Sequence, residues 1–219
     1  MTRYIAVTGT DTDVGKTIVT AALAAALAAD GLAVVVVKPV QTGVKPGEPG
    51  DVDDVARLSG VEVRELARLE PALAPESAAR QEGVDLPTVG DHVERTRALD
   101  HDVVIIEGAG GVLVRLDLDG GTIIDIATRL DAEVVVVTRE TLGTLNHTTL
   151  TVDRLRDAGL DPVLVIGSAE PDPSPEALSN HADLPRLSGC PITGRIPAGA
   201  GSLPGSDFSD RAPGWFTRL

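Results

Sequence analysis

The segment Gly9-Thr10-Asp11-Thr12-Asp13-Val14-Gly15-Lys16-Thr17 lies between an apolar β-type run over residues 4–8 and a helical pattern over residues 18–29. A strand, a glycine-containing loop that ends in Gly-Lys-Thr, and a helix together form the layout of a phosphate-binding P-loop. The loop amides and the helix N-terminus point at an anion, Lys16 can reach the β- and γ-phosphates, and the Thr17 hydroxyl can bind Mg²⁺. The segment therefore predicts a nucleotide site.

One position departs from the usual P-loop spacing, which places a glycine five residues before Gly15. Here that position is Thr10, and the glycine is Gly9. The strand and helix on either side still favour a P-loop over a glycine-rich turn with a solvated lysine. The predicted nucleotide contacts in and beside this loop are Asp13, Val14, Gly15, Lys16, Thr17 and Ile18.

Lysine is rare in this chain, which has three lysines and sixteen arginines. Lys16 lies in the predicted P-loop, and Lys38 follows the apolar run over residues 32–37, which is typical of a buried parallel strand. Sheets of α/β proteins place their ligands at the carboxyl ends of such strands. Because a compact ammonium suits a place where anionic charge develops, Lys38 and Lys16 are the predicted catalytic residues.

Two carboxylates are candidates for the metal site. Glu107 ends the β-branched apolar run over residues 103–106, and P-loop enzymes hold Mg²⁺ with a carboxylate at such a strand end. Asp51 opens a helical pattern over residues 51–58, where spacing alone favours a helix cap. The small residues that follow Glu107, which let backbone amides approach a ligand, are Gly108, Ala109 and Gly110.

Strand-like and helical patterns alternate along the chain. This order predicts an α/β fold of three layers, a mostly parallel central sheet with helices on both faces, in one domain over residues 1–219. Residues 133–138 are expected to form a further buried strand, and residues 88–99 a helix with His92 exposed. The segment over residues 75–80 fits a pocket wall and a surface helix equally well.

The bulk composition excludes several classes of protein. The formal net charge of −14 disfavours binding to nucleic acids and to anionic membranes. The single cysteine, Cys190, excludes an internal disulfide and a cysteine-based metal cluster. No targeting pattern opens the chain and no apolar run reaches the roughly 20 residues of a membrane span, so we expect a soluble cytoplasmic protein.

Four motifs together resemble the dethiobiotin synthetase family in order and spacing. Besides the P-loop segment, they are Lys38-Pro39-Val40-Gln41-Thr42-Gly43, Glu107-Gly108-Ala109-Gly110-Gly111 and Leu142-Gly143-Thr144-Leu145-Asn146-His147. The resemblance runs from about residue 2 to the C-terminus. It implies a P-loop NTPase fold, ATP as co-substrate and Mg²⁺ as cofactor.

The resemblance also implies a reaction. Dethiobiotin synthetase joins CO₂ to 7,8-diaminononanoate, closes a ureido ring and converts ATP to ADP and phosphate. One amine takes up CO₂ as a carbamate, the carbamate oxygen attacks the γ-phosphate, and the second amine displaces phosphate. By this resemblance, Lys38 stabilises the carbamate and the transferring phosphoryl group, and Lys16 holds the β- and γ-phosphates.

Further roles follow from the resemblance alone. It makes Thr17, Asp51 and Glu107 the ligands of Mg²⁺, with Asp53 and Asp54 as open alternatives to Asp51. It makes Thr12 and Thr42 contacts of the carbamate or substrate, and it puts Asp13 beside the phosphates. The far end of the substrate is expected to meet residues from the partner subunit of a homodimer, namely Leu142, Gly143, Thr144, Leu145 and Asn146.

The expected base site departs from the family pattern. Many family members carry Asn-Asp after the corresponding strand, and the Asn side chain reads adenine; this chain has Gly167 and Ser168 there. Preference for ATP over other nucleotides is therefore open. Pro197, Ala198 and Gly199 are expected to flank the base or ribose by the same resemblance.

Other P-loop proteins are the alternatives. A ParA/MinD-like switch ATPase would carry a signature lysine near the start of the loop, where this chain has Thr10 and Asp11. An amidoligase of the cobyrinate type would carry a glutaminase domain with a nucleophilic cysteine, a context that Cys190 lacks. Phosphate release that depends on a diamine distinguishes the ligase from both.

Overall fold

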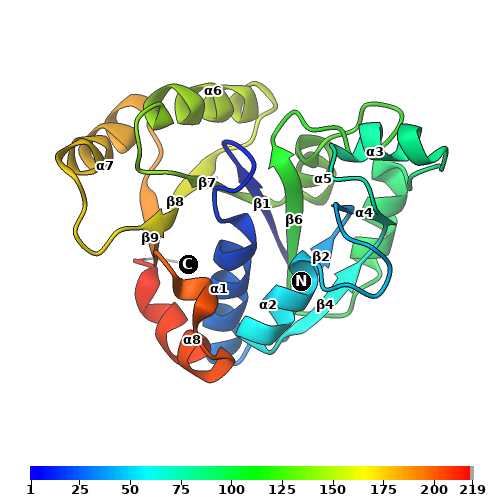
Figure 1. The fold of residues 1–219 in the computed structure, drawn as a ribbon, viewed down its shortest axis with the longest axis horizontal. Helices are drawn as coiled ribbons and strands as arrows, with labels where there is room; N and C mark the ends of the chain where they lie inside the picture. The colour runs from blue at the N-terminus through cyan, green and yellow to red at the C-terminus, as the bar shows by residue number, and fades with distance from the viewer. Residues whose placement is uncertain (218–219) are drawn as a thin grey trace.

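A parallel sheet forms the centre of the molecule, and the computed structural model describes the chain over residues 1–217 (Figure 1). Its strands lie in the order β4-β2-β6-β1-β7-β8-β9, and the pairs between them are parallel. The strands are β1 (Arg3–Gly9), β2 (Val34–Lys38), β4 (Glu62–Glu65), β6 (Val103–Gly111), β7 (Glu133–Thr138), β8 (Pro162–Ala169) and β9 (Ile192–Pro197). The predicted α/β class is confirmed.

Helices cover both faces of this sheet. Helices α1, α2 and α8 pack together on one face, whereas α4, α5, α6 and α7 belong to the core of the other. The helices are α1 (Lys16–Ala29), α2 (Asp51–Ser59), α3 (Pro75–Glu82), α4 (Val89–Arg97), α5 (Ile123–Leu130), α6 (Thr144–Asp157), α7 (Pro175–Ser188) and α8 (Gly205–Arg211), with short 3₁₀ turns η1 (Ala200–Ser202) and η2 (Ala212–Trp215).

Two hydrophobic cores result, one on each face. Successive residues of a strand point to opposite faces of a sheet, so Ala6 of β1 packs in one core while Ile5 and Val7 pack in the other. Val35 and Val36 of β2 divide in the same way. Both cores consist mainly of Val, Leu, Ile and Ala, because aromatic residues make up only 2% of the chain.

The path of the chain creates a crevice at the carboxyl ends of the central strands. From β1 the chain passes to β2 and β4 on one side, returns to β6 beside β1, and then continues through β7, β8 and β9 on the other side. Parallel sheets bind ligands where the strand order reverses in this manner. The topology therefore brings the ends of β1, β2 and β6 to one place.

Three short strands were not predicted. They are β4 and the two strands of a second parallel sheet, β3 (Gln41–Thr42) and β5 (Arg68–Leu69). The edge strand β4 has the sequence Glu-Val-Arg-Glu, with no residue fully buried, and so lacks the apolar run that marks the central strands. A strand of two residues has no periodicity to detect.

The prediction that His92 is exposed is wrong. His92 has a relative accessibility of 0%, and neither of its ring nitrogens has a hydrogen-bond partner. Together with Val89, Val93 and Thr96 it forms the buried stripe of α4, at the spacing of one helix face. The helix turns this face toward α5, so position on the helix outweighs the polarity of the ring.

The C-terminal segment packs on the body of the chain, against α1, α2 and β9. The rings of Phe208 and Trp215 meet edge to face with centroids 5.0 Å apart. Phe216 forms an antiparallel bridge with Gly194 of β9, and the Thr217 N–H donates to the Thr193 carbonyl at 2.8 Å. Within residues 1–217, every helix is too short or too polar to cross a membrane.

Candidate active site

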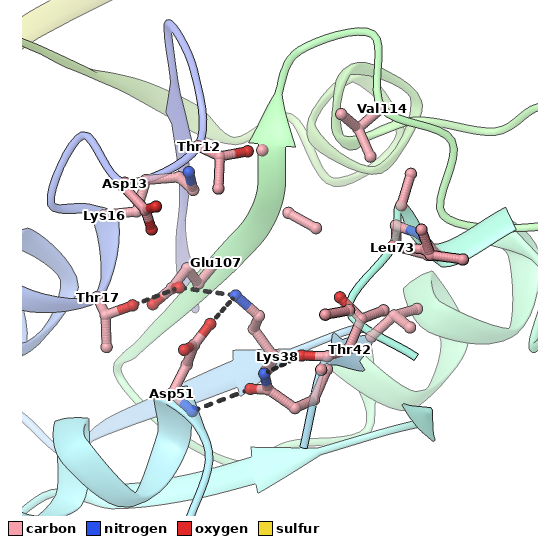
Figure 2. Close-up of a pocket in the computed structure, with 18 of the residues that line it drawn as sticks. Thr12, Asp13, Lys16, Thr17, Lys38, Thr42, Asp51, Leu73, Glu107 and Val114 are labelled. Carbon is pink, nitrogen blue, oxygen red and sulfur yellow. Dashed lines mark hydrogen bonds and ion pairs between the residues drawn. The ribbon is translucent and has the colours of Figure 1, made fainter. Parts of the chain in front are cut away.

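A cavity of about 700 Å³ opens at the carboxyl ends of β2 and β6, beside the P-loop (Figure 2). The P-loop, the start of α2, residues 72–75 and the end of β6 all contribute to its wall. These segments are far apart in the sequence, and the parallel sheet brings them together. The cavity contains both predicted catalytic lysines, Lys16 and Lys38.

Lys38 is at the centre of a buried network of charged groups. Strands β2 and β6 are paired neighbours, so Lys38 and Glu107 lie side by side. Lys38 Nζ donates to Glu107 Oε1 at 2.8 Å and to Asp51 Oδ2 at 2.6 Å. The Thr17 hydroxyl donates to the same Glu107 oxygen at 3.0 Å. Figure 2 shows these groups as one connected chain of interactions along the cavity wall.

Burial and the neighbouring charges act in opposite directions on the pKa of Lys38. The side chains of Lys38 and Glu107 are only 4% and 2% exposed. Burial by itself would lower the pKa of Lys38, but the carboxylates of Glu107 and then Asp51 outweigh it and raise the pKa above its ordinary value. Lys38 is therefore a fixed cation in the cavity.

Lys16 is the second buried cation of the cavity. Its Nζ donates to the Asp11 carbonyl at 2.9 Å, which folds the side chain back over the P-loop. Burial, and then the like charge of Lys38, lower the pKa of Lys16. Gly15 has a positive φ of 94° at the N-terminus of α1, so the first amides of this helix face the cavity as an anion site requires.

Asp51 makes contacts that differ from those of the neighbouring Asp53 and Asp54. Asp51 lines the cavity and contacts Lys38. The carboxylate of Asp53 instead accepts the Gly50 N–H at 2.7 Å, which caps α2, and Asp54 pairs with Arg57 on the surface at 2.7 Å. The side chain that caps α2 is therefore that of Asp53 and not that of Asp51.

The donor set of the cavity fits a magnesium ion. Mg²⁺ is held by oxygen ligands, usually one or two carboxylates together with phosphate and water. The Thr17 hydroxyl and the carboxylates of Asp51 and Glu107 provide such oxygens within one connected network. Over residues 1–217 no group of three His, Cys, Asp or Glu side chains could hold a metal, so the fit rests on these two carboxylates and the hydroxyl.

A second cavity of about 350 Å³ lies on the other side of the P-loop. It shares Asp13, Gly15 and Ile18 with the first cavity, so the two cavities adjoin at the P-loop. Predicted nucleotide contacts that line this second cavity are Val14, Gly167, Ser168, Pro197 and Gly199. The arrangement places a base-sized space next to the phosphate loop.

Two of the predicted nucleotide contacts, Ala198 and Gly108, line neither cavity. The Ala198 N–H donates to the Ala169 carbonyl at 2.8 Å, so this residue joins β8 to β9. Gly108 is buried, and its carbonyl accepts a hydrogen bond from Lys38 Nζ at 3.3 Å. Ala109 and Gly110 do line the first cavity.

Gly167 is required by packing rather than by the ligand. A Cβ atom at this position would collide with the Val14 carbonyl oxygen, and one at Gly15 would lie 2.7 Å from the Gly167 carbonyl oxygen. The P-loop and the end of β8 therefore touch backbone to backbone. No side chain at position 167 can read a base here.

The chain is similar to known proteins along nearly its whole length. A protein-family model described as an AAA domain matches residues 3–202. The chain is 52% identical over 216 residues to the ATP-dependent dethiobiotin synthetase BioD of Rhodococcus jostii (strain RHA1), which covers 97% of this chain and 94% of that protein. It is 51% identical over 216 residues to the protein of the same name from Streptomyces coelicolor (strain ATCC BAA-471 / A3(2) / M145), with 96% and 90% covered.

The chain belongs to the dethiobiotin synthetase family.

Similarity to solved structures adds information on the fold alone. The septum site-determining protein MinD of Pyrococcus horikoshii OT3, solved with Mg-ADP, superposes with a TM-score of 0.60 at 22% identity over 98% of this chain and 91% of that chain. Chloroplast FtsY from Physcomitrella patens has a TM-score of 0.57 at 16% identity, over 97% and 65%. As a dethiobiotin synthetase the chain is an ATP-dependent ligase, and the MinD-like proteins are its distant fold relatives.

The predicted substrate contacts of this dethiobiotin synthetase divide into two groups. Thr12 and Thr42 line the first cavity. None of residues 142–146 lines either cavity of their own chain; Leu142 is 81% exposed, and the Thr144 hydroxyl donates to the Arg139 carbonyl at 2.7 Å. A role for this segment in the partner's site stays a prediction.

Sequence reasoning missed part of the cavity wall. Leu73 and Val114 add apolar surface on the side away from the P-loop (Figure 2). Gln41 positions Asp51, whose N–H donates to Gln41 Oε1 at 2.9 Å. Gln41 lies inside the Lys38 motif, which could have revealed it, whereas Leu73 and Val114 lie in loops without a pattern. The segment at residues 75–80 is both a pocket wall and a surface helix, because Pro75 lines the cavity and the Arg80 side chain is 62% exposed.

Proposed function

We propose that this dethiobiotin synthetase joins CO₂ to 7,8-diaminononanoate and closes the ureido ring at the expense of ATP, releasing ADP and phosphate. The family supports ATP and the diamine as substrates. The observation that supports the rest is the convergence of two buried lysines, Lys16 and Lys38, on one cavity with Thr17, Asp51 and Glu107. Phosphoryl transfer depends mainly on positioning and on neutralised charge, and this set provides both.

The proposed nucleotide extends through both cavities. The triphosphate lies against the P-loop amides and Lys16, at the positive end of α1. The base enters the second cavity beside Ser168 and Pro197. This cavity adjoins the first at the shared residues Asp13, Gly15 and Ile18. Because no side chain at Gly167 contacts the base, we expect recognition through shape and backbone groups, and a small preference for adenine.

Thr17, Asp51 and Glu107 would hold Mg²⁺, since their oxygens match its preference. When bound, the ion neutralises the phosphate oxygens and orients them. Lys38 contacts both carboxylates. It therefore offsets part of their negative charge and presents a cation to the neighbouring substrate space.

The proposed chemistry has three steps. An amine nitrogen attacks the carbon of CO₂ and loses a proton, which gives a carbamate. A carbamate oxygen then attacks the γ-phosphorus and the bond to the ADP oxygen breaks. The second amine attacks the carbonyl carbon of the resulting mixed anhydride and loses a proton, and the bond from that carbon to the phosphate oxygen breaks, so that phosphate leaves as the ring closes.

The residues of the cavity act at definite stages of this reaction. Lys38 stabilises negative charge on the carbamate and on the transferring phosphoryl group, and it does so more strongly because it is buried. Thr12 and Thr42 offer hydroxyls to the carbamate. Leu73 and Val114 provide apolar surface for the alkyl chain of the diamine.

We further infer a homodimer in which Leu142, Gly143, Thr144, Leu145 and Asn146 of one subunit bind the carboxylate end of the substrate held by the other. The exposure of Leu142, Gly143 and Asn146 at the N-terminus of α6 supports this role, since the positive end of a helix favours an anion. Light scattering tests it, and a monomer at working concentration would remove the assignment. The single-domain organisation and the cytoplasmic location stay predictions from the sequence.

Phosphate release tests the proposed activity directly. We expect release with Mg-ATP and bicarbonate only when 7,8-diaminononanoate is present, and comparable release with CTP or GTP at higher concentrations. Release without the diamine would instead indicate a switch ATPase. A strict requirement for ATP would show that groups other than residue 167 read the base.

A further inference from the structure

Glu140 is a buried carboxylate to which the proposed chemistry gives no role. It follows β7 in the loop that leads to α6, and it lines the second cavity. Its side chain is only 5% exposed. Because a buried carboxylate is costly without partners, its contacts show what it holds in place.

Glu140 contacts two other segments of the chain. Its Oε1 accepts the backbone N–H of Glu170 at 3.0 Å, and its Oε2 lies 2.8 Å from His181 Nε2. Its backbone carbonyl accepts a hydrogen bond from the Asn180 side-chain amide at 2.9 Å. The loop after β7, the loop after β8 and helix α7 thus meet at a single residue.

The segment after β7 and the end of β8 with the loop that follows it both line the second cavity, and we call them its first and second walls. Arg139 and Thr141 belong to the first wall, and Ser168 and Glu170 to the second. The first wall is also tied to the P-loop, since Arg139 Nη2 donates to the Thr12 carbonyl at 2.8 Å. Glu140 therefore joins the two walls through its hydrogen bond to the Glu170 N–H, and its side-chain contacts include no residue of α1.

We propose that Glu140 and His181 form a clamp that sets the width of the base pocket, so that both are positioning residues for the nucleoside part of the co-substrate. The proposal rests on the nucleotide placement given above. It predicts an effect on the nucleoside and none on the phosphates. That difference can be measured with a probe that has phosphates only.

The experiment compares the dissociation constants of ATP and of inorganic triphosphate, each with MgCl₂, for the full-length chain and its variants. For Glu140→Ala we expect the constant for ATP to rise about tenfold, in line with the loss of hydrogen bonds to a charged group, and that for triphosphate to stay unchanged. KM for ATP should rise in parallel while kcat at saturating ATP is retained. His181→Ala should act in the same direction, and His181→Gln should restore most of the affinity because its amide can donate to Glu140.

Controls separate the clamp from general loss of structure. Asp183→Asn breaks a surface ion pair with Arg186 on the same helix, α7, and should change neither constant. Thermal unfolding shows whether Glu140→Ala folds. If it does not, the comparison of His181→Ala with His181→Gln still tests the proposal.

Three results would overturn the proposal. Unchanged ATP affinity in folded Glu140→Ala and His181→Ala would show that the pair does not shape the pocket. An equal loss of ATP and triphosphate affinity would show that it acts on the P-loop instead. If triphosphate does not compete with ATP in the unaltered chain, the nucleotide placement itself is wrong, and the clamp fails with it.

Discussion

The ammonium nitrogen of Lys38, at the end of β2, lies 2.8 Å from Oε1 of Glu107, a buried residue of the neighbouring parallel strand β6. A second carboxylate, that of Asp51, contacts the same ammonium at 2.6 Å. One cation thus bridges two acidic groups of the cavity. Stability and activity both depend on this arrangement, and variants can separate the two.

Lys38→Met should lower both stability and turnover. The substitution leaves Glu107 buried without its cation, which costs about 3 kcal/mol of unfolding free energy, and kcat/KM should fall about 100-fold or more with the loss of charge stabilisation. Denaturant unfolding and diamine-dependent phosphate release measure these effects. The double variant with Glu107→Gln should regain stability but not activity. Near-normal turnover of Lys38→Met would contradict a mechanism with two lysines.

Lys16→Ala should weaken the binding of the ATP phosphates with little effect on the fold. We expect kcat/KM for ATP to fall about 100-fold, the equivalent of about 3 kcal/mol for a lost charged contact. Lys45→Ala is the matched control, since Lys45 is the third lysine of the chain and is exposed in a loop. Equal effects of the two substitutions on steady-state kinetics would argue against a specific role for Lys16.

Gly167→Ala should impair ATP binding although it adds only one methyl group. The new Cβ meets the Val14 carbonyl, so the P-loop must move; we expect a loss of about 1–3 kcal/mol in stability and about tenfold in ATP affinity. Gly214→Ala, where a Cβ meets no atom within 4 Å, is the control. Calorimetric titration with ATP distinguishes them, and normal affinity in Gly167→Ala would show that the loop tolerates displacement.

His92 should make stability depend on pH. Burial, and then the charge of Arg95, lower its pKa from 6.5 to about 4. Between these values the unfolded chain binds a proton that the folded chain does not, so the unfolding free energy falls as the pH falls, by about 2 kcal/mol from pH 7 to pH 5. His92→Leu should reduce that dependence in urea titrations at the two pH values. An unchanged slope would mean that other groups dominate.

The sequence predicted the parts of the site that lie at strand ends. Lys38 and Glu107 each follow an apolar run, and parallel strands end at one edge, so their proximity follows from local patterns alone. The choice between Asp51, Asp53 and Asp54 does not follow from local patterns. All three lie in the first turn of α2, and only the orientation of this helix decides which one contacts Lys38.

Contacts between distant loops were beyond prediction for a similar reason. Glu140 and His181 are 41 residues apart, and neither belongs to a motif. The burial of His92 was missed because a histidine on a helix was read by its polarity instead of by the stripe that it shares with Val89 and Val93.

The edge-to-face pair of Phe208 and Trp215 gives the chain a built-in optical reporter. Trp215 is its single tryptophan, and it contacts neither of the two cavities of the candidate active site. Its emission therefore responds to the docking of the C-terminal segment on α1 and β9. A fluorescence change on adding nucleotide would mean that ligand binding at the P-loop alters the packing of the C-terminal segment on α1. No change would mean that the emission reports only the unfolding of this segment.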